Sequence, residues 1–288
     1  MRRRALVAGA VLVLAAAGAA WMFREPMILG WLGSGVAKTT LAEREARLEP
    51  ALHVYMPAAG SPPYPVVLQF HGCGGYKPAF QEQWARAATD KGFMAIGVDS
   101  YAPRGITRER ALKSVCNGKE LIGQERAGDV AAALEIVRKR SDVDLSRFVL
   151  AGWSHGAWTV MDYLALTGAR NHIPGLADAR ASRPPIAGVF LVYPHCGLGA
   201  WTRLRDWGAA PPTLALIAGA DTIVDPKACP PLFARLKAHG ATIDAHVYPK
   251  ADHAFDDDWL PEGWTHMFDA AVRDDAVARY QSFLDSID

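Results

Sequence analysis

The chain has 288 residues, of which 50% are hydrophobic and 21% are charged, and its formal net charge is +1. This length allows one large α/β domain or two small ones, and the apolar share allows a substantial core. The near-neutral charge argues against nucleic acid or an anionic surface as the main partner.

The N-terminus has the pattern of an export signal. Arginines at positions 2–4 precede the uncharged run Ala5–Phe23, which is rich in Ala, Val and Leu. Ala17–Ala19 offers a small-residue cleavage site, but the run is also long enough to span a bilayer if it stays uncut. In both cases the body leaves the cytoplasm for the periplasm or the exterior, because the positive end stays inside. We therefore expect residues 1–23 to be a signal peptide or an N-terminal membrane anchor.

The number of cysteines agrees with export. Four cysteines permit three pairings if all are bonded: Cys73, Cys116, Cys196 and Cys229. An oxidising compartment allows two disulfides, and four free buried thiols are the alternative. No C-x-x-C pair or His/Cys cluster has the spacing of a zinc site, so no metal is expected.

After a connector at residues 24–47, strand and helix patterns alternate through residues 48–288. Apolar or alternating runs predict strands at 51–56, 64–70, 94–98, 148–151, 186–193, 213–218 and 242–248. Amphipathic or apolar runs predict helices at 80–91, 120–140, 157–164, 226–239 and 266–287. This alternation predicts one α/β domain, a mostly parallel sheet with helices on both faces.

The pentapeptide Gly152–Gly156 reads Gly-Trp-Ser-His-Gly and lies between a buried strand and a helix. By itself G-x-S-x-G is a weak pattern, and an ordinary strand-to-helix turn is the alternative. In this setting, however, the turn is tight and pushes the serine into a strained, exposed conformation at the tip of the strand. The position therefore favours Ser154 as a nucleophile.

Three other strand ends carry residues that fit the same chemistry. His71–Gly75 is a glycine-rich turn, Gly219–Asp225 supplies acids, and Pro249–Phe255 contains a histidine. Parallel strands bring their carboxyl ends to one edge of the sheet. The order serine, acid, histidine is that of the α/β-hydrolase arrangement.

The chemistry assigns a role to each residue. Serine needs a base, so His253 would take the proton of Ser154 and return it to the leaving group. Asp221 would hold the imidazole in the right tautomer. Backbone N–H groups of His155 and Cys73, with Gly72 as the neighbouring candidate for the latter, would face the oxyanion.

These motifs, together with Asp99–Gly105 (DSYAPRG), resemble the dienelactone hydrolase family of α/β-hydrolases from about Leu48 to the C-terminus. The resemblance implies an α/β-hydrolase fold, a Ser/Cys–Asp–His triad, no cofactor and hydrolysis of esters or lactones. The enzymes that give the family its name carry cysteine where this chain has Ser154. The chain therefore looks more like the exported, serine-bearing branch.

Some assignments have competitors. Asp225 is the alternative acid, although it lies deeper in its loop, next to Pro226. His239 and His246 are expected to be structural. Strand order suggests that Cys73 pairs with Cys116 and that Cys196 pairs with Cys229.

Several loop residues at the active end of the sheet are candidates for substrate binding, with ordinary loop packing as the alternative. We single out Tyr101, Arg104 and Trp201 among them. The acidic run Asp256–Asp258 is expected to be a solvated loop. No insertion is long enough to form a large lid, which predicts an open pocket.

The sequence thus predicts a cofactor-independent serine hydrolase that cleaves a small-molecule ester or lactone outside the cytoplasm, with no nucleic-acid partner. A serine peptidase or an acyltransferase of the same fold is the nearest alternative. A catalytically inactive binding module is a further one, although this chain keeps candidates for all three triad positions.

Overall fold

A seven-stranded sheet forms the centre of this computed structural model, which describes residues 9, 11–14, 17–18, 36–167, 172–178, 184–208 and 210–287. The strands follow the order β1-β3-β2-β4-β5-β6-β7, in which β1 pairs antiparallel with β3 and all other neighbours are parallel. Their bounds are β1 Leu52–Tyr55, β2 Tyr64–Phe70, β3 Met94–Val98, β4 Val143–Trp153, β5 Ile186–Val192, β6 Thr213–Ala218 and β7 Ile243–Tyr248.

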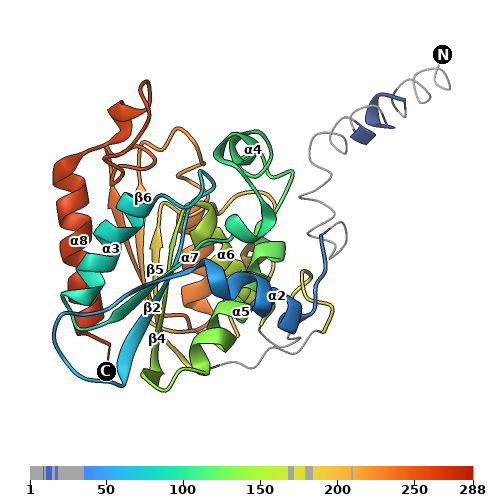
Figure 1. Cartoon of the computed structure of the whole chain (residues 1–288). Coiled ribbons are helices and arrows are strands. Elements are labelled where there is room, and N and C mark those ends of the chain that lie inside the picture. The colour runs from blue at the N-terminus through green and yellow to red at the C-terminus, as the bar shows by residue number, and fades with distance from the viewer. Residues whose placement is uncertain are drawn as a thin grey trace, which may run out of the picture.

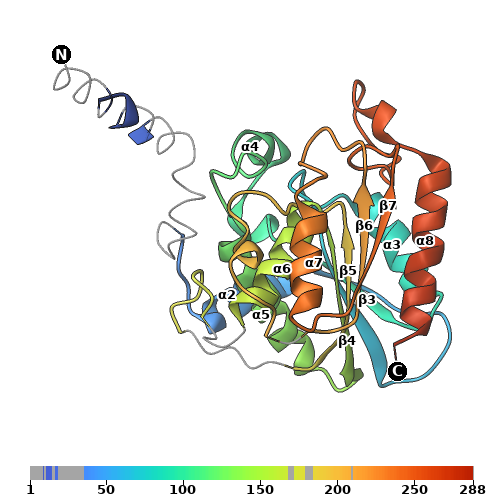
Figure 2. The same ribbon diagram turned by 180° about the vertical axis from the view of Figure 1, so that it is seen from behind.

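Helices cover both faces of the sheet (Figures 1 and 2). One face carries α3 (Pro78–Thr89) and α8 (Ala270–Asp285), which contact each other. The opposite face carries α2 (Leu41–Leu48), α5 (Gly123–Arg138), α6 (His155–Leu166) and α7 (Cys229–Ala238). A short helix, α4 (Arg108–Lys113), lies beyond the carboxyl ends of the strands. The chain therefore has the three-layer α/β arrangement that the sequence predicts.

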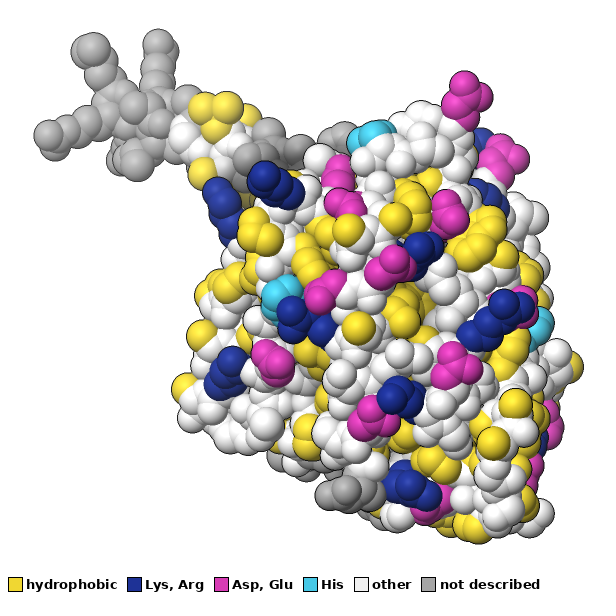
Figure 3. Space-filling model, turned by 90° about the vertical axis from the view of Figure 1, so that its left-hand side faces the viewer, with side chains coloured by type: hydrophobic (Ala, Val, Ile, Leu, Met, Phe, Trp, Pro, Cys, Tyr) yellow, Lys and Arg dark blue, Asp and Glu magenta, His cyan; other side chains and the backbone are white. Residues whose placement is uncertain are grey.

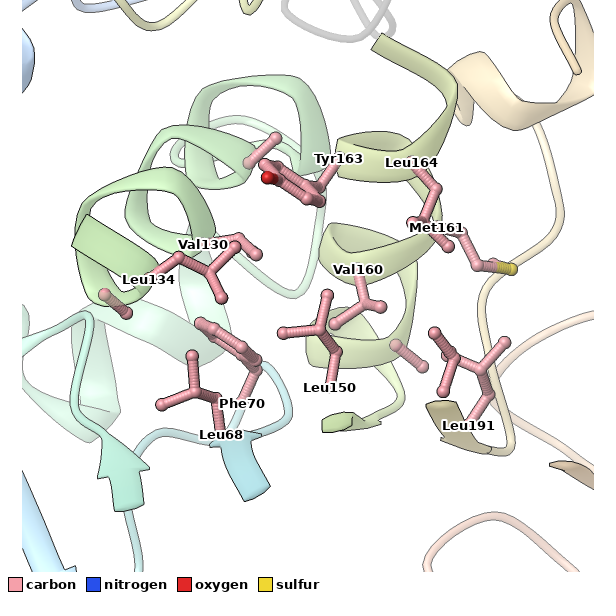
Figure 4. Close-up of a cluster of buried hydrophobic side chains, with 14 of the residues drawn as sticks. Leu68, Phe70, Val130, Leu134, Leu150, Val160, Met161, Tyr163, Leu164 and Leu191 are labelled. Atoms are coloured by element: carbon pink, nitrogen blue, oxygen red, sulfur yellow. The ribbon is translucent and has the colours of Figure 1, made fainter. Parts of the chain in front are cut away.

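Alternation along the strands explains why both faces need helices. In β2, Leu68 and Phe70 face α5 and α6, whereas Val67 faces the other way, toward Trp84 of α3. Successive strand residues point to opposite faces, so strands that are apolar throughout bury both sides. Figure 4 shows the α5/α6 side of this core, with side chains from β2, β4, β5, α5 and α6 packed together: Leu68, Phe70, Leu150, Leu191, Val130, Leu134, Val160, Met161, Tyr163 and Leu164.

In the described range 36–287, outside its gaps, the predicted strands and helices are confirmed, with β4 starting five residues earlier than expected, and the α-helices α2 and α4 are additional. One of them, α2, lies at the end of the expected connector. Its start is a capping box in which Thr40 and Glu43 satisfy each other's backbone N–H groups. It is anchored by Arg44, a buried arginine that bonds to Asp129 of α5 at 3.1 Å. The domain boundary near residue 48 stays a prediction.

The surface shown in Figure 3 has basic and acidic side chains interspersed, with no large patch of either sign on that face. This distribution agrees with a net charge of +1. In the described part of the chain, no helix is both long and apolar enough to cross a membrane. The predicted leader lies largely outside the described residues, so its nature stays a prediction.

Candidate active site

Ser154 sits on a strained turn between β4 and α6. Its backbone has φ 52° and ψ −112°, a conformation that non-glycine residues rarely adopt and that costs about 1–3 kcal/mol. The turn is possible because both flanking glycines lack a side chain. A Cβ on Gly156 would lie 1.9 Å from the carbonyl oxygen of Phe70, and one on Gly152 would lie 2.6 Å from the backbone nitrogen of Ala157. The predicted nucleophile turn is therefore present, and β2 packs directly against it.

Loops from two other strands bring an imidazole and a carboxylate to this serine. His253, after β7, has its Nε2 at 2.9 Å from Ser154 Oγ and its Nδ1 at 2.7 Å from Asp221 Oδ2. Asp221, after β6, uses its other oxygen to accept backbone N–H groups of Ile223 at 2.9 Å and Val224 at 2.8 Å. The acid is thus fixed by its own loop, and the imidazole is fixed by the acid.

The other acid and histidine candidates do not join Ser154, His253 and Asp221. The Asp225 carboxylate accepts the backbone N–H of Lys227 and makes no hydrogen bond to His253. The ring of His239 bonds to Asp206 at 2.7 Å. Among the acids that the sequence offered, Asp221 is the one that contacts the imidazole.

The two segments that carry the predicted oxyanion donors meet at Ser154. A Cβ on Gly72 would lie 3.6 Å from Ser154 Cβ, so the turn after β2 touches the serine. The carbonyl of the next residue, Cys73, accepts a hydrogen bond from the Tyr101 hydroxyl at 2.8 Å, which fixes the turn. His155 begins α6, and the first N–H groups of a helix have no partner within it. These segments carry the backbone N–H groups of Cys73 and His155, whose role as oxyanion donors stays a prediction.

Both expected disulfides are present. Cys73 bonds to Cys116 and Cys196 bonds to Cys229, each pair with Cα atoms 5.1 Å apart. The first bond joins the turn that touches Ser154 to the loop after α4. The cysteines thus brace two loops at the active end of the sheet.

Two recesses open beside Ser154, with volumes of about 570 Å³ and 520 Å³. The larger has an apolar wall that includes Phe80, Leu112, Leu260, Trp264 and Met267. The smaller has a more polar wall that includes Asn117, Gly118, Lys119, His155 and His195. Ser154, Cys73, Cys116, Asn117 and Ile223 line both, so the serine stands where they meet.

The three expected substrate-binding residues do not line either recess. Tyr101 is buried and bonds to the Cys73 carbonyl. Arg104 is turned toward Asp129, which it holds through two hydrogen bonds of 2.8 and 3.0 Å, because that buried carboxylate needs a counter-charge. Trp201 lies under the guanidinium of Arg205, 4.0 Å from the ring centre.

The expectation of a solvated loop at Asp256–Asp258 is wrong for its first two residues, which are buried. Asp256 accepts hydrogen bonds from Trp84 Nε1 at 3.1 Å, Trp153 Nε1 at 3.1 Å and the Tyr193 hydroxyl at 2.7 Å. Burial raises the pKa of its carboxyl to about 7. A run of three acids does not show in the sequence that Trp84, Trp153 and Tyr193 will donate hydrogen bonds to it.

In the part of the chain that the structure describes, no group of three or more His, Cys, Asp or Glu side chains could hold a metal ion.

Comparisons with known proteins give one family match and a shared fold. Residues 52–174 match the model of the dienelactone hydrolase family. The matched segment is similar to that family and makes up less than half of the chain. It spans the strands up to β4, the turn at Ser154 and helix α6. No curated protein matches the chain in sequence.

Three solved structures share the α/β-hydrolase fold of this chain. A Klebsiella pneumoniae protein assigned as a dienelactone hydrolase superposes with a TM-score of 0.60 at 16% identity, covering 82% of this chain and 92% of the other. A thermophilic esterase of Thermogutta terrifontis with bound propionate gives 0.58 at 14% identity, covering 82% and 89%. A dienelactone hydrolase-like promiscuous phosphotriesterase from metagenomic libraries gives 0.56 at 16% identity, covering 82% and 99%.

Proposed function

We propose that this protein is a serine hydrolase that cleaves a carboxylic ester or lactone through an acyl-enzyme on Ser154. The observation that carries the proposal is the bridge made by His253, with one ring nitrogen 2.9 Å from Ser154 Oγ and the other 2.7 Å from Asp221. Nucleophile, base and orienting acid are thereby in hydrogen-bond reach in the order that acyl transfer needs.

The reaction would proceed in two steps. Ser154 Oγ attacks the substrate carbonyl carbon while its proton passes to His253 Nε2, and Asp221 stabilises the imidazolium that forms. The carbonyl oxygen becomes an oxyanion, which the backbone N–H groups of Cys73 and His155 would bind. The imidazolium then gives its proton to the leaving alkoxide as the C–O bond breaks. A water molecule, deprotonated by the same imidazole, hydrolyses the acyl-enzyme and releases the acid.

The larger recess supports an apolar group on one side of the scissile bond. Leu112 and Trp264 lie at its mouth, each 46% exposed, and Phe80 and Met267 form part of its wall. Exposed apolar side chains around a concave site indicate binding of an apolar ligand group. The smaller recess, with Lys119 in its wall, would take the more polar part of the substrate.

Relatives in structure support the same class. The Thermogutta terrifontis esterase has been seen with propionate and with butyrate, and phosphonylated by cyclosarin. These are properties of that esterase. They make short-chain esters and fluorophosphonates the first probes for the present protein.

Export also belongs to the proposal. The structure pairs the four cysteines in two disulfides, and such bonds persist in oxidising compartments. Together with the basic, apolar N-terminus, they support a place outside the cytoplasm. Fractionation of cells that produce the full chain should recover it from the periplasm or the membrane, and recovery from the cytoplasm with reduced cysteines would contradict this.

The experiment uses the full chain with its disulfides formed. We expect it to hydrolyse p-nitrophenyl esters of graded acyl length and to react with a fluorophosphonate probe at Ser154. Ser154→Ala should abolish labelling and lower turnover by at least a thousandfold. Ser146→Ala, the same change at an exposed serine at the opposite end of β4, should leave both unchanged. Labelling that persists in Ser154→Ala would rule out this nucleophile.

A further inference from the structure

Arg126 of α5 is a fully buried arginine that lies between the two segments flanking Ser154. Its side chain has no exposed surface. Its Nη1 donates to the carbonyl oxygen of His71 at 2.8 Å and contacts Nδ1 of His155 at 3.0 Å. Its Nε donates to the Ser100 hydroxyl at 2.9 Å. One nitrogen atom therefore holds the end of β2 and the start of α6 together.

These two contacts fall next to the proposed oxyanion donors. The His71 carbonyl immediately precedes the Gly72–Cys73 turn, and His155 carries the second backbone N–H itself. Neither contact reaches the nucleophile, the base or the acid. Arg126 thus contacts the two segments that carry the proposed oxyanion donors.

The contact with His155 also determines which ring nitrogen of that imidazole carries the proton. A guanidinium can only donate, so Nδ1 of His155 accepts and its proton lies on Nε2. Burial first, and then the nearby charge of Arg126, hold the pKa of His155 well below its usual value. The same two causes, in the same order, lower the pKa of His71. Both imidazoles are therefore neutral, so neither places a second positive charge beside Arg126.

No carboxylate hydrogen-bonds to this arginine among the described residues. Asp129, one turn further along α5, is instead bonded to Arg44 and Arg104. The Nη2 of Arg126 is buried without a hydrogen-bond partner in the described part of the chain. A buried cation without a directly paired acid costs free energy that an apolar side chain of similar size would not. This charge lies next to the two segments that carry the proposed oxyanion donors, where it can favour a negative charge on the substrate.

We propose that Arg126 is a positioning residue for the oxyanion hole: it sets the spacing of the Cys73 and His155 N–H groups, and its buried charge favours the negative charge that develops on the substrate oxygen. This role rests on the proposed hydrolase function. Because the oxyanion exists only in and around the transition state, losing the arginine should lower kcat and leave KM nearly unchanged.

The test compares Arg126→Met and Arg126→Lys with Arg44→Met. Arg44 is a matched control, since it is also a buried arginine bonded to α5 but makes no contact with His71 or His155. We expect Arg126→Met to lower kcat about a hundredfold, in the range for loss of one oxyanion donor, with KM changed less than threefold. Arg126→Lys keeps the charge, so its kcat should be about tenfold higher than that of Arg126→Met. Arg44→Met should keep the wild-type kcat even though it lowers the melting temperature.

A second pair keeps the test sound if Arg126→Met does not fold. His155→Leu removes the acceptor of Nη1, whereas His155→Asn offers an amide oxygen near the place of Nδ1. The leucine variant should lose more kcat, and more of its rate of fluorophosphonate labelling, than the asparagine variant. Equal losses in the two His155 variants, or a wild-type kcat in Arg126→Met, would overturn the role of Arg126 alone. A wild-type protein without turnover or labelling at Ser154 would instead overturn the hydrolase function, and this inference with it.

Discussion

Trp153 donates a hydrogen bond from its Nε1 to the carboxylate of Asp256, 3.1 Å away. Trp153 precedes the nucleophile candidate Ser154, and Asp256 lies three residues after His253, so this bond ties the nucleophile turn to the loop that carries the imidazole. The Tyr193 hydroxyl binds the same carboxylate, and its ring packs 4.5 Å from the ring of His253. Asp256 therefore holds the turn of Ser154 through Trp153, and it holds the His253 ring through Tyr193, which packs against that ring.

Replacing Asp256 tests this link. Asp256→Ala leaves two indole N–H groups and the Tyr193 hydroxyl buried without an acceptor, which should lower the free energy of unfolding by about 3–5 kcal/mol. Asp256→Asn keeps one acceptor oxygen for the indoles, and its amide can donate to the tyrosine oxygen, so it should lose about 1–2 kcal/mol. Urea unfolding measures both. Asp258→Ala, a change at an exposed neighbour, serves as the control.

Turnover should follow the same order. The alanine variant should lose kcat by about tenfold or more, because His253 is no longer held at its distance from Ser154. A fully stable Asp256→Ala protein with normal turnover would show that the carboxylate positions nothing.

The contrast between Asp221 and Asp256 shows what a sequence of this kind can predict. Asp221 could be predicted as a candidate because a parallel sheet brings the ends of its strands together, although Asp225 of the same loop remained the alternative. Asp256 could not, because its donors come from α3, from the nucleophile turn and from the end of β5. From the sequence alone, a run of acids predicts a solvated loop, because its buried hydrogen-bond partners lie far away in the chain.

Long-range pairing limits the other predictions in the same way. The layers of the fold followed from apolar runs, whose burial depends little on the exact partner. The sequence predicts that Arg104 lies on a loop at the active end of the sheet, but it does not predict the two hydrogen bonds to Asp129, which join separate segments. The sequence does not predict α2, because this polar eight-residue helix is anchored by one buried arginine, Arg44.

The identity of the triad acid can be tested with two matched amides. Asp221→Asn should lower kcat by about 10³–10⁴-fold, because the imidazole loses the group that sets its tautomer. Asp225→Asn should retain wild-type turnover, since that carboxylate contacts only its own loop. Steady-state kinetics on a p-nitrophenyl ester measures both. The opposite ranking would assign the acid to Asp225.

The two disulfides should contribute similar stability but unequal activity. Their loops span 43 and 33 residues, for which the chain-entropy model gives about 4 kcal/mol each. Replacing Cys73 and Cys116 together by serine should lower both the unfolding free energy and kcat, because the first bond holds the turn that touches Ser154. The Cys196/Cys229 double serine variant should lose similar stability and keep most of its kcat. Equal kcat losses at equal stability would indicate a purely structural effect.

Asp162 of α6 should make stability depend on pH above the acid range. It is fully buried and accepts hydrogen bonds from Trp158 Nε1 at 2.7 Å, Gln124 Nε2 at 2.9 Å and the Thr202 backbone at 3.0 Å. Burial nevertheless raises the pKa of its carboxyl to about 8 in the folded protein, from 3.8. Between these two values the folded state binds more protons than the unfolded state.

Stability contributed by this group is therefore complete below about pH 4 and is lost as the pH rises toward 8, with a slope of up to about 1.4 kcal/mol per pH unit. Asp162→Asn removes the titration. The wild type should lose unfolding free energy relative to this variant from pH 5 to pH 8, and the difference should level off above that. Urea unfolding at pH 5, 6, 7, 8 and 9 measures it, with Asp258→Asn as the exposed control. A difference that does not change with pH would mean that Asp162 is ionised throughout, stabilised by its three donors.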